Sequence, residues 1–423
     1  MNHLALFGGM KTITDPFTPY RSIGSEEAAA ALSVVEKGIL SKFLGSWDPD
    51  FYGGEMVRAL EQAWGKYFLV KHAVTVNSAT SGLIAAVGAI GIEPGDEVIV
   101  SPWTMSASAT AILVWNAIPV FADIEDETFN LDPHAIEKNI TPYTRAIMVP
   151  DIFGHPADMD AIMAIAKKYD LKVIEDCAQA PGALYNGRYA GTIADIGVFS
   201  LNYHKHIHTG EGGVCVTNDA KLAERLQLIR NHAESVVGDK GVDDLSNMIG
   251  FNFRMTEIEA AIGFEQLKKL NTLISRRIAV AGRLSSGLSG LKGLRPPVVK
   301  TDCTHVYYVY PLLYNPEETR VPRDHVFNAL AAEGVPIAGR YTNIHLLPIY
   351  QKRMAYGTKG VPWSADFYKG NVSYEKGICP VAEILQDGKF LGIGMCVNTY
   401  TDQDVDLIIE AFRKVWNHLD QLT

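Results

Sequence analysis

Lys205 lies between an apolar run at residues 196–201 and a glycine-rich turn at residues 210–213. The glycines let the backbone bend and come close to a ligand. An ammonium group in a semi-buried, cation-rich setting has a lowered pKa, which favours attack on a carbonyl and formation of an imine. Lys205 is therefore a candidate for covalent catalysis, although a structural lysine beside a turn is an equally good interpretation of this segment alone.

Two further segments place polar groups directly after apolar runs. Residues 173–180 contain an apolar strand that ends in the carboxylate of Asp176. In an enzyme that uses pyridoxal phosphate, such a carboxylate keeps the pyridine nitrogen protonated; a solvated aspartate or a helix N-cap is the plainer interpretation. Residues 77–83 are small and hydroxylated, so backbone N–H groups at a helix start and the Thr80 hydroxyl could hold a phosphate. In isolation a simple N-cap is favoured there.

Three histidines, His204, His206 and His208, alternate as on one face of a strand. Such a set could bind a metal ion. No further cluster of ligands lies nearby in the sequence, and alternating histidines are more often packing or hydrogen-bonding groups, so no metal site is predicted. The chain also lacks a GxGxxG after a strand, a Walker loop, an HExxH and a GxSxG. Dinucleotide, nucleoside-triphosphate, zinc-protease and serine-hydrolase functions have no support.

Alternating strands and helices position these residues. Short apolar runs predict strands at residues 73–77, 97–101, 119–122, 145–149, 172–175, 196–201 and 213–217. Helical patterns at residues 81–91, 107–115, 158–169 and 220–231 fall between them. This order predicts an α/β fold with a helix-covered, mainly parallel sheet, whose strand ends are where ligands bind.

A long helical pattern at residues 257–288 links this part to a smaller second domain. That domain contains a β-rich run at residues 305–314 and an amphipathic helix at residues 403–419. We expect a large cofactor-binding domain, N-terminal arm included, over residues 1–270 and a small α+β domain over residues 271–423.

Composition narrows the class of protein. The 423 residues are 47% hydrophobic and 20% charged, with a formal net charge of −10 and no Lys/Arg-rich tract, so no nucleic acid or membrane partner is predicted. Residues 1–9 lack the basic and long apolar segments of a signal peptide. Five widely spaced cysteines without a CxxC pair read as free thiols. A cytoplasmic protein is expected.

The segments taken together resemble the DegT/DnrJ/StrS family of sugar aminotransferases, which are fold-type I pyridoxal-phosphate enzymes. The matching stretches follow the family's order and spacing and lie within residues 5–290; they are residues 77–83, 94–99, 119–123, 156–160, 175–180, 205–213 and 250–255. Each stretch is weak alone, but their consistency is decisive. The resemblance implies a mainly parallel seven-stranded sheet covered by helices, with a smaller α+β C-terminal domain.

The resemblance also implies a role for each matching residue. Lys205 would form the Schiff base with pyridoxal 5'-phosphate, Asp176 would pair with the pyridine nitrogen, and Gln179 would approach the phenolic oxygen. The phosphate would be held by Ala79, Thr80 and Ser200, with Asn252 reaching in from the partner subunit of a homodimer with shared active sites. The position that commonly stacks an aromatic ring on the cofactor is Met105, which leaves either its thioether or nearby Trp103 for that contact.

The implied reaction moves an amino group from glutamate or glutamine to a keto-sugar, with pyridoxamine phosphate as intermediate. A nucleotide-linked keto-sugar is expected, for amino-sugar biosynthesis; a cyclitol ketone is the alternative. Relatives that dehydrate keto-sugars carry histidine at the lysine position, so Lys205 favours transamination. A non-catalytic regulator that binds the cofactor is less consistent with Lys205 and Asp176. Candidate acceptor contacts, each of which could equally be a core or surface residue, are His305, Tyr307, Arg340, Tyr341 and His345.

Overall fold

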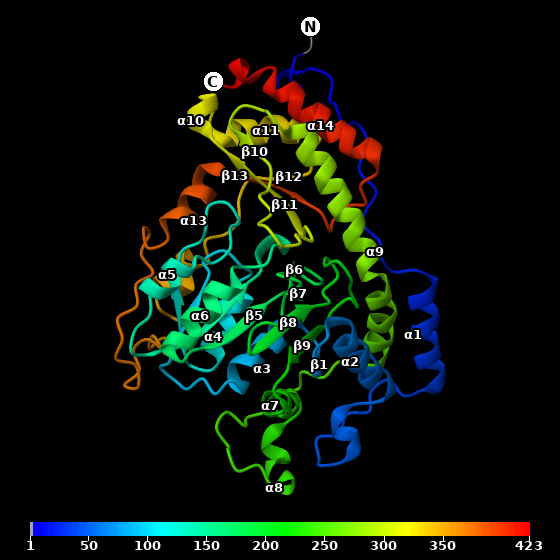
Figure 1. Cartoon of the computed structure of the whole chain (residues 1–423), viewed down its shortest axis with the longest axis vertical. Helices are drawn as coiled ribbons and strands as arrows, with labels where there is room; N and C mark the ends of the chain where they lie inside the picture. The colour runs from blue at the N-terminus through cyan, green and yellow to red at the C-terminus, as the bar shows by residue number, and fades with distance from the viewer. Residues whose placement is uncertain (1–2) are drawn as a thin grey trace.

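A seven-stranded sheet lies at the centre of the larger part of the molecule in the computed structural model, which describes residues 3–423 (Figure 1). Residues 1–2, the first of those considered for a signal peptide, lie outside that range. In chain order the strands are β1 (His72–Val76), β2 (Glu97–Val100), β3 (Ile118–Phe121), β4 (Thr144–Pro150), β5 (Lys172–Asp176), β8 (Ile196–Ser200) and β9 (Gly213–Thr217). Across the sheet they follow the order β1-β9-β8-β5-β4-β2-β3.

The sheet is parallel except at β9, which pairs antiparallel with both β1 and β8. This confirms the expected mainly parallel, seven-stranded sheet. Strands β2, β3, β8 and β9 are buried along their whole length. Strands buried on both faces read as continuous apolar runs, which is why the sequence shows them clearly.

Helices cover the sheet on both faces. They are α2 (Glu55–Phe68), α3 (Ala79–Ala89), α4 (Ala107–Val114), α5 (Pro133–Lys138), α6 (Met159–Tyr169) and α7 (Ala220–Arg230), with α1 (Ser25–Lys37) and α8 (Val237–Lys240) further out. Helix α3 packs on β8 and β9, while α2 packs on β1. A small hairpin, β6 (Leu184–Tyr185) with β7 (Arg188–Tyr189), lies apart from the main sheet.

Helix α9 (Glu257–Leu288) connects the two parts of the chain, with the bounds that the sequence predicts. It starts at Thr256, whose hydroxyl accepts from the Glu259 N–H while the Glu259 carboxylate accepts from the Thr256 N–H, a capping box. Leu270 packs in the core beneath α2, and Leu284 packs in the core of the C-terminal part. The boundary expected after residue 270 falls within this helix, and the division into two domains stays a prediction.

The C-terminal part is built on an antiparallel sheet, seen at the top of Figure 1, in the order β10 (Leu294–Arg295), β11 (Val309–Tyr314), β13 (Phe390–Gly394) and β12 (Ile337–Ala338). Its helices are α10 (Pro316–Thr319), α11 (Arg323–Glu333), α12 (Pro348–Gln351), α13 (Pro380–Ile384) and α14 (Asp402–Trp416). None of the helices in the described residues combines the length and apolar character of a membrane span.

Candidate active site

The sequence-predicted residues meet at one edge of the large sheet. Asp176 is the last residue of β5, and Ser200 is the last residue of β8. Because these strands are parallel neighbours, their carboxyl ends lie at the same edge. The chain leaves the sheet at Ser200 and returns at Gly213, which pairs with Ser200 on one side and with Val76 of β1 on the other. Lys205 lies in the loop between these two points.

Lys205 is buried, with 7% of its surface exposed. Burial lowers the pKa of its amine to about 8, although Asp176 and Cys396 act in the opposite direction. Within residues 3–423 its Nζ makes no hydrogen bond or ion pair, and it lies 4.2 Å from the centroid of the Tyr308 ring. The lowered pKa makes the neutral amine, the form that attacks a carbonyl, more abundant near physiological pH than it is for an exposed lysine.

The Asp176 carboxylate is buried and held by two donors. Oδ2 accepts from the Ser108 hydroxyl at 2.7 Å, and Oδ1 accepts from the Ala178 N–H at 3.2 Å. Burial raises the pKa of Asp176, whereas these hydrogen bonds and Lys205 lower it. Ser108 lies in α4, the helix that follows β2, and β2 is two strands away from β5 in the sheet. The local sequence around Asp176 therefore gives no sign of this contact. The Thr104 hydroxyl lies 2.9 Å from that of Ser108 and extends this network.

Replacing Ser108 by alanine is expected to lower turnover about five- to thirtyfold, because a hydrogen bond that orients a buried carboxylate is worth about 1–2 kcal/mol. Steady-state kinetics on the variant would measure the loss. Thr110→Ala on the exposed side of the same helix is the matched control. Equal turnover for Ser108→Ala and wild type would show that Ala178 alone orients Asp176.

Residues 77–83 form the start of α3, and a phosphate-binding role for them stays a prediction. Ser78 is the N-cap, and its hydroxyl accepts from the Ser81 N–H at 3.1 Å. The helix therefore begins at Ala79, two residues before the predicted start. The exposed Thr80 and Ala79 lie in its first turn, whose amides have no intrahelical acceptors. A Cβ at Gly213 would lie 2.7 Å from the Ala79 nitrogen, so only glycine allows β9 to approach this turn so closely.

Gln179 joins the site to the C-terminal part. Its Oε1 accepts from the Phe153 N–H at 2.7 Å, and its Nε2 donates to the Tyr341 hydroxyl at 3.2 Å. Of the five candidate acceptor contacts, the structure therefore brings Tyr341 to a residue of the site. Arg340 is exposed and pairs with Asp324.

The remaining three acceptor candidates have structural partners elsewhere. His305 is buried and stacks on Tyr307 with ring centroids 3.9 Å apart. His345 is buried with its Nε2 3.0 Å from a carboxylate oxygen of Glu383. Both histidines have a pKa lowered chiefly by burial. Their surroundings indicate core residues, which is the plainer interpretation of these side chains.

Met105 and Trp103, the two candidates for stacking on the cofactor, have opposite surroundings. Trp103 is fully buried, donates from its indole nitrogen to Asn343 Oδ1 at 2.6 Å and stacks on Phe129. Met105 is 65% exposed. Since Trp103 is held in the core, Met105 is the side chain of the two that is free to contact a ligand.

Asn252 lies beside the start of α3 in its own subunit. Its backbone carbonyl accepts from Asn77 Nδ2 at 3.3 Å, and its side-chain Oδ1 accepts from Arg254 Nε at 2.8 Å. A role for Asn252 in the site of a partner subunit stays a prediction. The three alternating histidines do not gather around one point: His206 bonds to the Val306 carbonyl, and His208 accepts from the Gly210 N–H.

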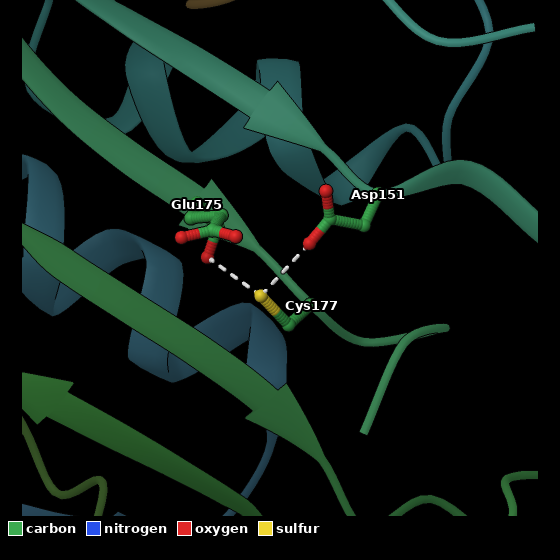
Figure 2. Close-up of side chains that lie close together, drawn as sticks. All are labelled: Asp151, Glu175 and Cys177. Atoms are coloured by element: carbon green, nitrogen blue, oxygen red, sulfur yellow. Dashed lines mark hydrogen bonds between the residues drawn. The ribbon is translucent and has the colours of Figure 1, made fainter. Parts of the chain in front are cut away.

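Behind Asp176, on the other face of β5, lies the buried cluster Asp151, Glu175 and Cys177 (Figure 2). Neighbouring residues of a strand point to opposite faces, which is why Glu175 and Cys177 point away from the site. The Cys177 thiol donates to Asp151 Oδ2 at 3.2 Å, and the Ala157 N–H donates to Oδ1. Burial raises the pKa of both carboxyl groups. Burial of this kind favours the protonated form of each carboxyl group.

Comparison with known proteins places this arrangement in context. The model of the DegT/DnrJ/EryC1/StrS aminotransferase family matches residues 47–376. A spore coat polysaccharide biosynthesis protein of Bacillus subtilis is 33% identical over 408 residues, 94% of this chain and 97% of that protein. GDP-perosamine synthase of Caulobacter vibrioides is 38% identical over 303 residues, 70% of this chain and 79% of that protein. A putative L-glutamine:3-amino-2,3-dideoxy-scyllo-inosose aminotransferase of Streptoalloteichus tenebrarius is 32% identical and spans 100% of this chain and 99% of that protein.

Solved structures agree with this comparison. The aminotransferase from Psychrobacter cryohalolentis superposes with a TM-score of 0.81 at 28% identity, covering 96% of this chain and 100% of that one. DesV of Streptomyces venezuelae, determined in complex with a ketimine intermediate, gives a TM-score of 0.78 at 30% identity over the same shares.

Proposed function

The chain belongs to the DegT/DnrJ/EryC1/StrS aminotransferase family, and on that premise we propose that it uses pyridoxal 5'-phosphate to transfer an amino group to the ketone of a keto-sugar. The placement of Lys205 and Asp176 at one sheet edge, with an amine whose pKa is lowered to about 8, carries the proposal. The match to GDP-perosamine synthase spans 79% of that protein and supports a sugar as the acceptor. The proposed setting is amino-sugar biosynthesis.

The residues present fit this cofactor. A buried carboxylate without an ion-pair partner in the described residues, Asp176, can face a pyridinium nitrogen. The first turn of α3 at Ala79 and Thr80, together with the Ser200 hydroxyl, offers donors for a phosphate. Because residue 213 is glycine, β9 can lie close beside that turn. Acid, amine and phosphate donors therefore lie at one edge, as the cofactor requires.

Bound pyridoxal phosphate would supply an aldehyde for amines and a cationic ring that accepts electrons from a breaking C–H bond. Lys205 Nζ would take the proton from the amino-bearing carbon of the donor and later return a proton to the former carbonyl carbon of the acceptor. Asp176, oriented by Ser108, would preserve the positive charge of the ring. Net transfer converts the donor amino acid to its keto acid and the ketone to an amine.

We propose a homodimer with shared active sites. Exposed apolar side chains on α1 and the loop after it, Leu32, Val35, Ile39, Leu40 and Leu44, support an interface there. Asn252 of a second subunit would then join Thr80 and Ser200 at the phosphate. The molar mass in solution would test this proposal.

Two classes of acceptor deserve comparison. A nucleotide-linked keto-sugar is the first, because the name GDP-perosamine synthase refers to a nucleotide sugar. A cyclitol ketone is the second, because the relative that spans the whole chain is named for an inosose and for L-glutamine as donor. Glutamate and glutamine are the proposed donors.

The test begins with the protein loaded with pyridoxamine phosphate. It is mixed with a panel of nucleotide-linked keto-sugars and cyclitol ketones, and the visible absorbance of the lysine-bound cofactor is followed. A nucleotide-linked keto-sugar is expected to restore that absorbance. Restoration by a cyclitol ketone alone would replace the first acceptor by the second. Failure of both classes, in a protein that binds the cofactor, would contradict sugar amination.

A further inference from the structure

The Lys205 amine lies over the face of the Tyr308 ring. Nζ lies 4.2 Å from the ring centroid, within the range of a cation–π interaction. In the part of the chain that the structure describes, no carboxylate lies within ion-pair distance of this amine. Tyr308 therefore provides the direct contact for its charge. The neighbouring Tyr307 is the residue that the sequence suggests as an acceptor contact.

The backbone of Tyr308 is fixed from both parts of the molecule. Its N–H donates to the Phe153 carbonyl at 2.8 Å, and its carbonyl accepts from the Met395 N–H at 3.0 Å. Gly154, at φ 101°, lets the large part approach closely: a Cβ there would lie 3.1 Å from the Tyr308 nitrogen. The ring is thus held by a rigid backbone at the junction between the large sheet and β11.

A left-handed residue separates Tyr307 from Tyr308. Tyr307 has φ 52°, a conformation that costs free energy for a bulky side chain. Its ring stacks on His305 and packs in the core of the C-terminal part, whereas the Tyr308 ring lies against Lys205. The strained turn therefore directs two successive aromatic rings to different places.

We propose that Tyr308 is a positioning residue, whose ring face holds the free ε-ammonium group of Lys205 in the active site. This inference rests on the proposed function, in which the lysine alternates between covalent attachment and free amine. Once free of the cofactor, a lysine side chain with no group nearby to stabilise its charge would sample many rotamers. The ring gives it one defined place, from which it can take up a proton again.

The ring also acts on protonation. Cation–π contact stabilises the ammonium form and so offsets part of the burial that lowers the pKa of Lys205. The other titratable groups facing the amine are Asp176 from β5, Cys396 after β13, and His204 and His206 of its own loop. The rings of His204 and His206 lie 6.1 and 6.3 Å from the Tyr308 ring, so Tyr308→Phe, which keeps that packing, is needed to separate the effect of the ring from that of its neighbours.

The experiment uses the full chain without cofactor, so that its outcome does not depend on turnover. Competitive acetylation with acetic anhydride from about pH 6 to 10, followed by mass spectrometry of the Lys205 peptide, measures the ionisation of this amine. Tyr308→Phe keeps the ring and is expected to match the wild type. Tyr308→Leu is expected to move the ionisation about 0.5–1 unit toward acid, giving about three- to tenfold more neutral amine at low pH. Tyr308→Met serves the same purpose if the leucine variant does not fold.

Tyr203→Leu, an exposed aromatic in the lysine loop, is the matched control and is expected to leave the ionisation unchanged. In the loaded enzyme, loss of the ring should lower kcat while the KM for the donor stays near the wild-type value. An unshifted ionisation in both Tyr308→Leu and Tyr308→Met would overturn the proposal. An equal shift in Tyr308→Phe would also overturn it, because the hydroxyl and not the ring would then be responsible.

Discussion

Replacing Lys205 by alanine is expected to lower turnover by about 10⁴-fold or more and to remove the visible absorbance of the lysine-bound cofactor. In the proposed mechanism the amine of Lys205 serves both for attachment of the cofactor and for proton transfer. Its buried position and lowered pKa prepare it for both roles. Absorbance spectra and single-turnover kinetics with glutamate and glutamine would measure the two losses separately.

Lys221→Ala provides the control, because Lys221 is an exposed lysine in the first turn of α7. It should retain wild-type absorbance and turnover. Added alkylamines are expected to restore part of the proton transfer in Lys205→Ala, since a small amine can enter the space left by the side chain. A Lys205→Ala protein with full activity would end the assignment of the catalytic lysine.

Asp176→Asn is expected to lower turnover by about 10²- to 10³-fold, the usual effect of removing one well-placed electrostatic contact. A neutral amide cannot preserve a positive charge on the cofactor ring. The hydrogen-bond pattern changes as well: both carboxylate oxygens now accept, from Ser108 and from the Ala178 N–H, whereas an amide has a single acceptor oxygen. Cofactor affinity and kcat should be measured side by side, because the larger loss is expected in kcat.

The matched control is Asp195→Asn. Asp195 lies just before β8, at the opposite edge of the sheet, where it accepts from the Val173 N–H. Its replacement is expected to affect stability and to leave kcat near the wild-type value. If Asp176→Asn turned over like the wild type, the carboxylate would have a structural role only.

The sequence predicted those parts of the fold that local patterns determine. Helix α9 was placed correctly because Thr256 and Glu259 form a capping box and an apolar stripe continues for the whole helix. The strands that end at Asp176 and Ser200 were predicted from buried apolar runs, with each end one residue away from the observed one. Helix α3 was placed two residues late because the N-cap is Ser78, and the first turn belongs to the helix before the apolar pattern becomes clear.

Asp176, Ser200 and Lys205 were predicted at or just after the ends of strands, and the structure brings them to one edge of the sheet, while their roles stay predictions. Ser108 was not predicted, because its contact with Asp176 joins α4 to β5 across the sheet and sequence periodicity does not indicate such long-range contacts. The contact of Tyr308 with Lys205 was not predicted for a different reason. The left-handed conformation of Tyr307 sends the two adjacent tyrosine rings to different places, and sequence alone gives no sign of that conformation.

The pairing of Ser200 with Gly213 has a consequence for engineering. Residues 201–212 leave and rejoin the sheet at adjacent points, and the Leu201 N–H donates to the Gly212 carbonyl at 2.9 Å, so the stem is closed by backbone bonds. The two ends of the lysine loop are therefore held together by backbone bonds, but a replacement loop would also have to keep the bond of His206 to the Val306 carbonyl and the packing of Ile207 in the core. A one-residue shift in β9 is a different matter, since it would turn every side chain of that strand to the other face.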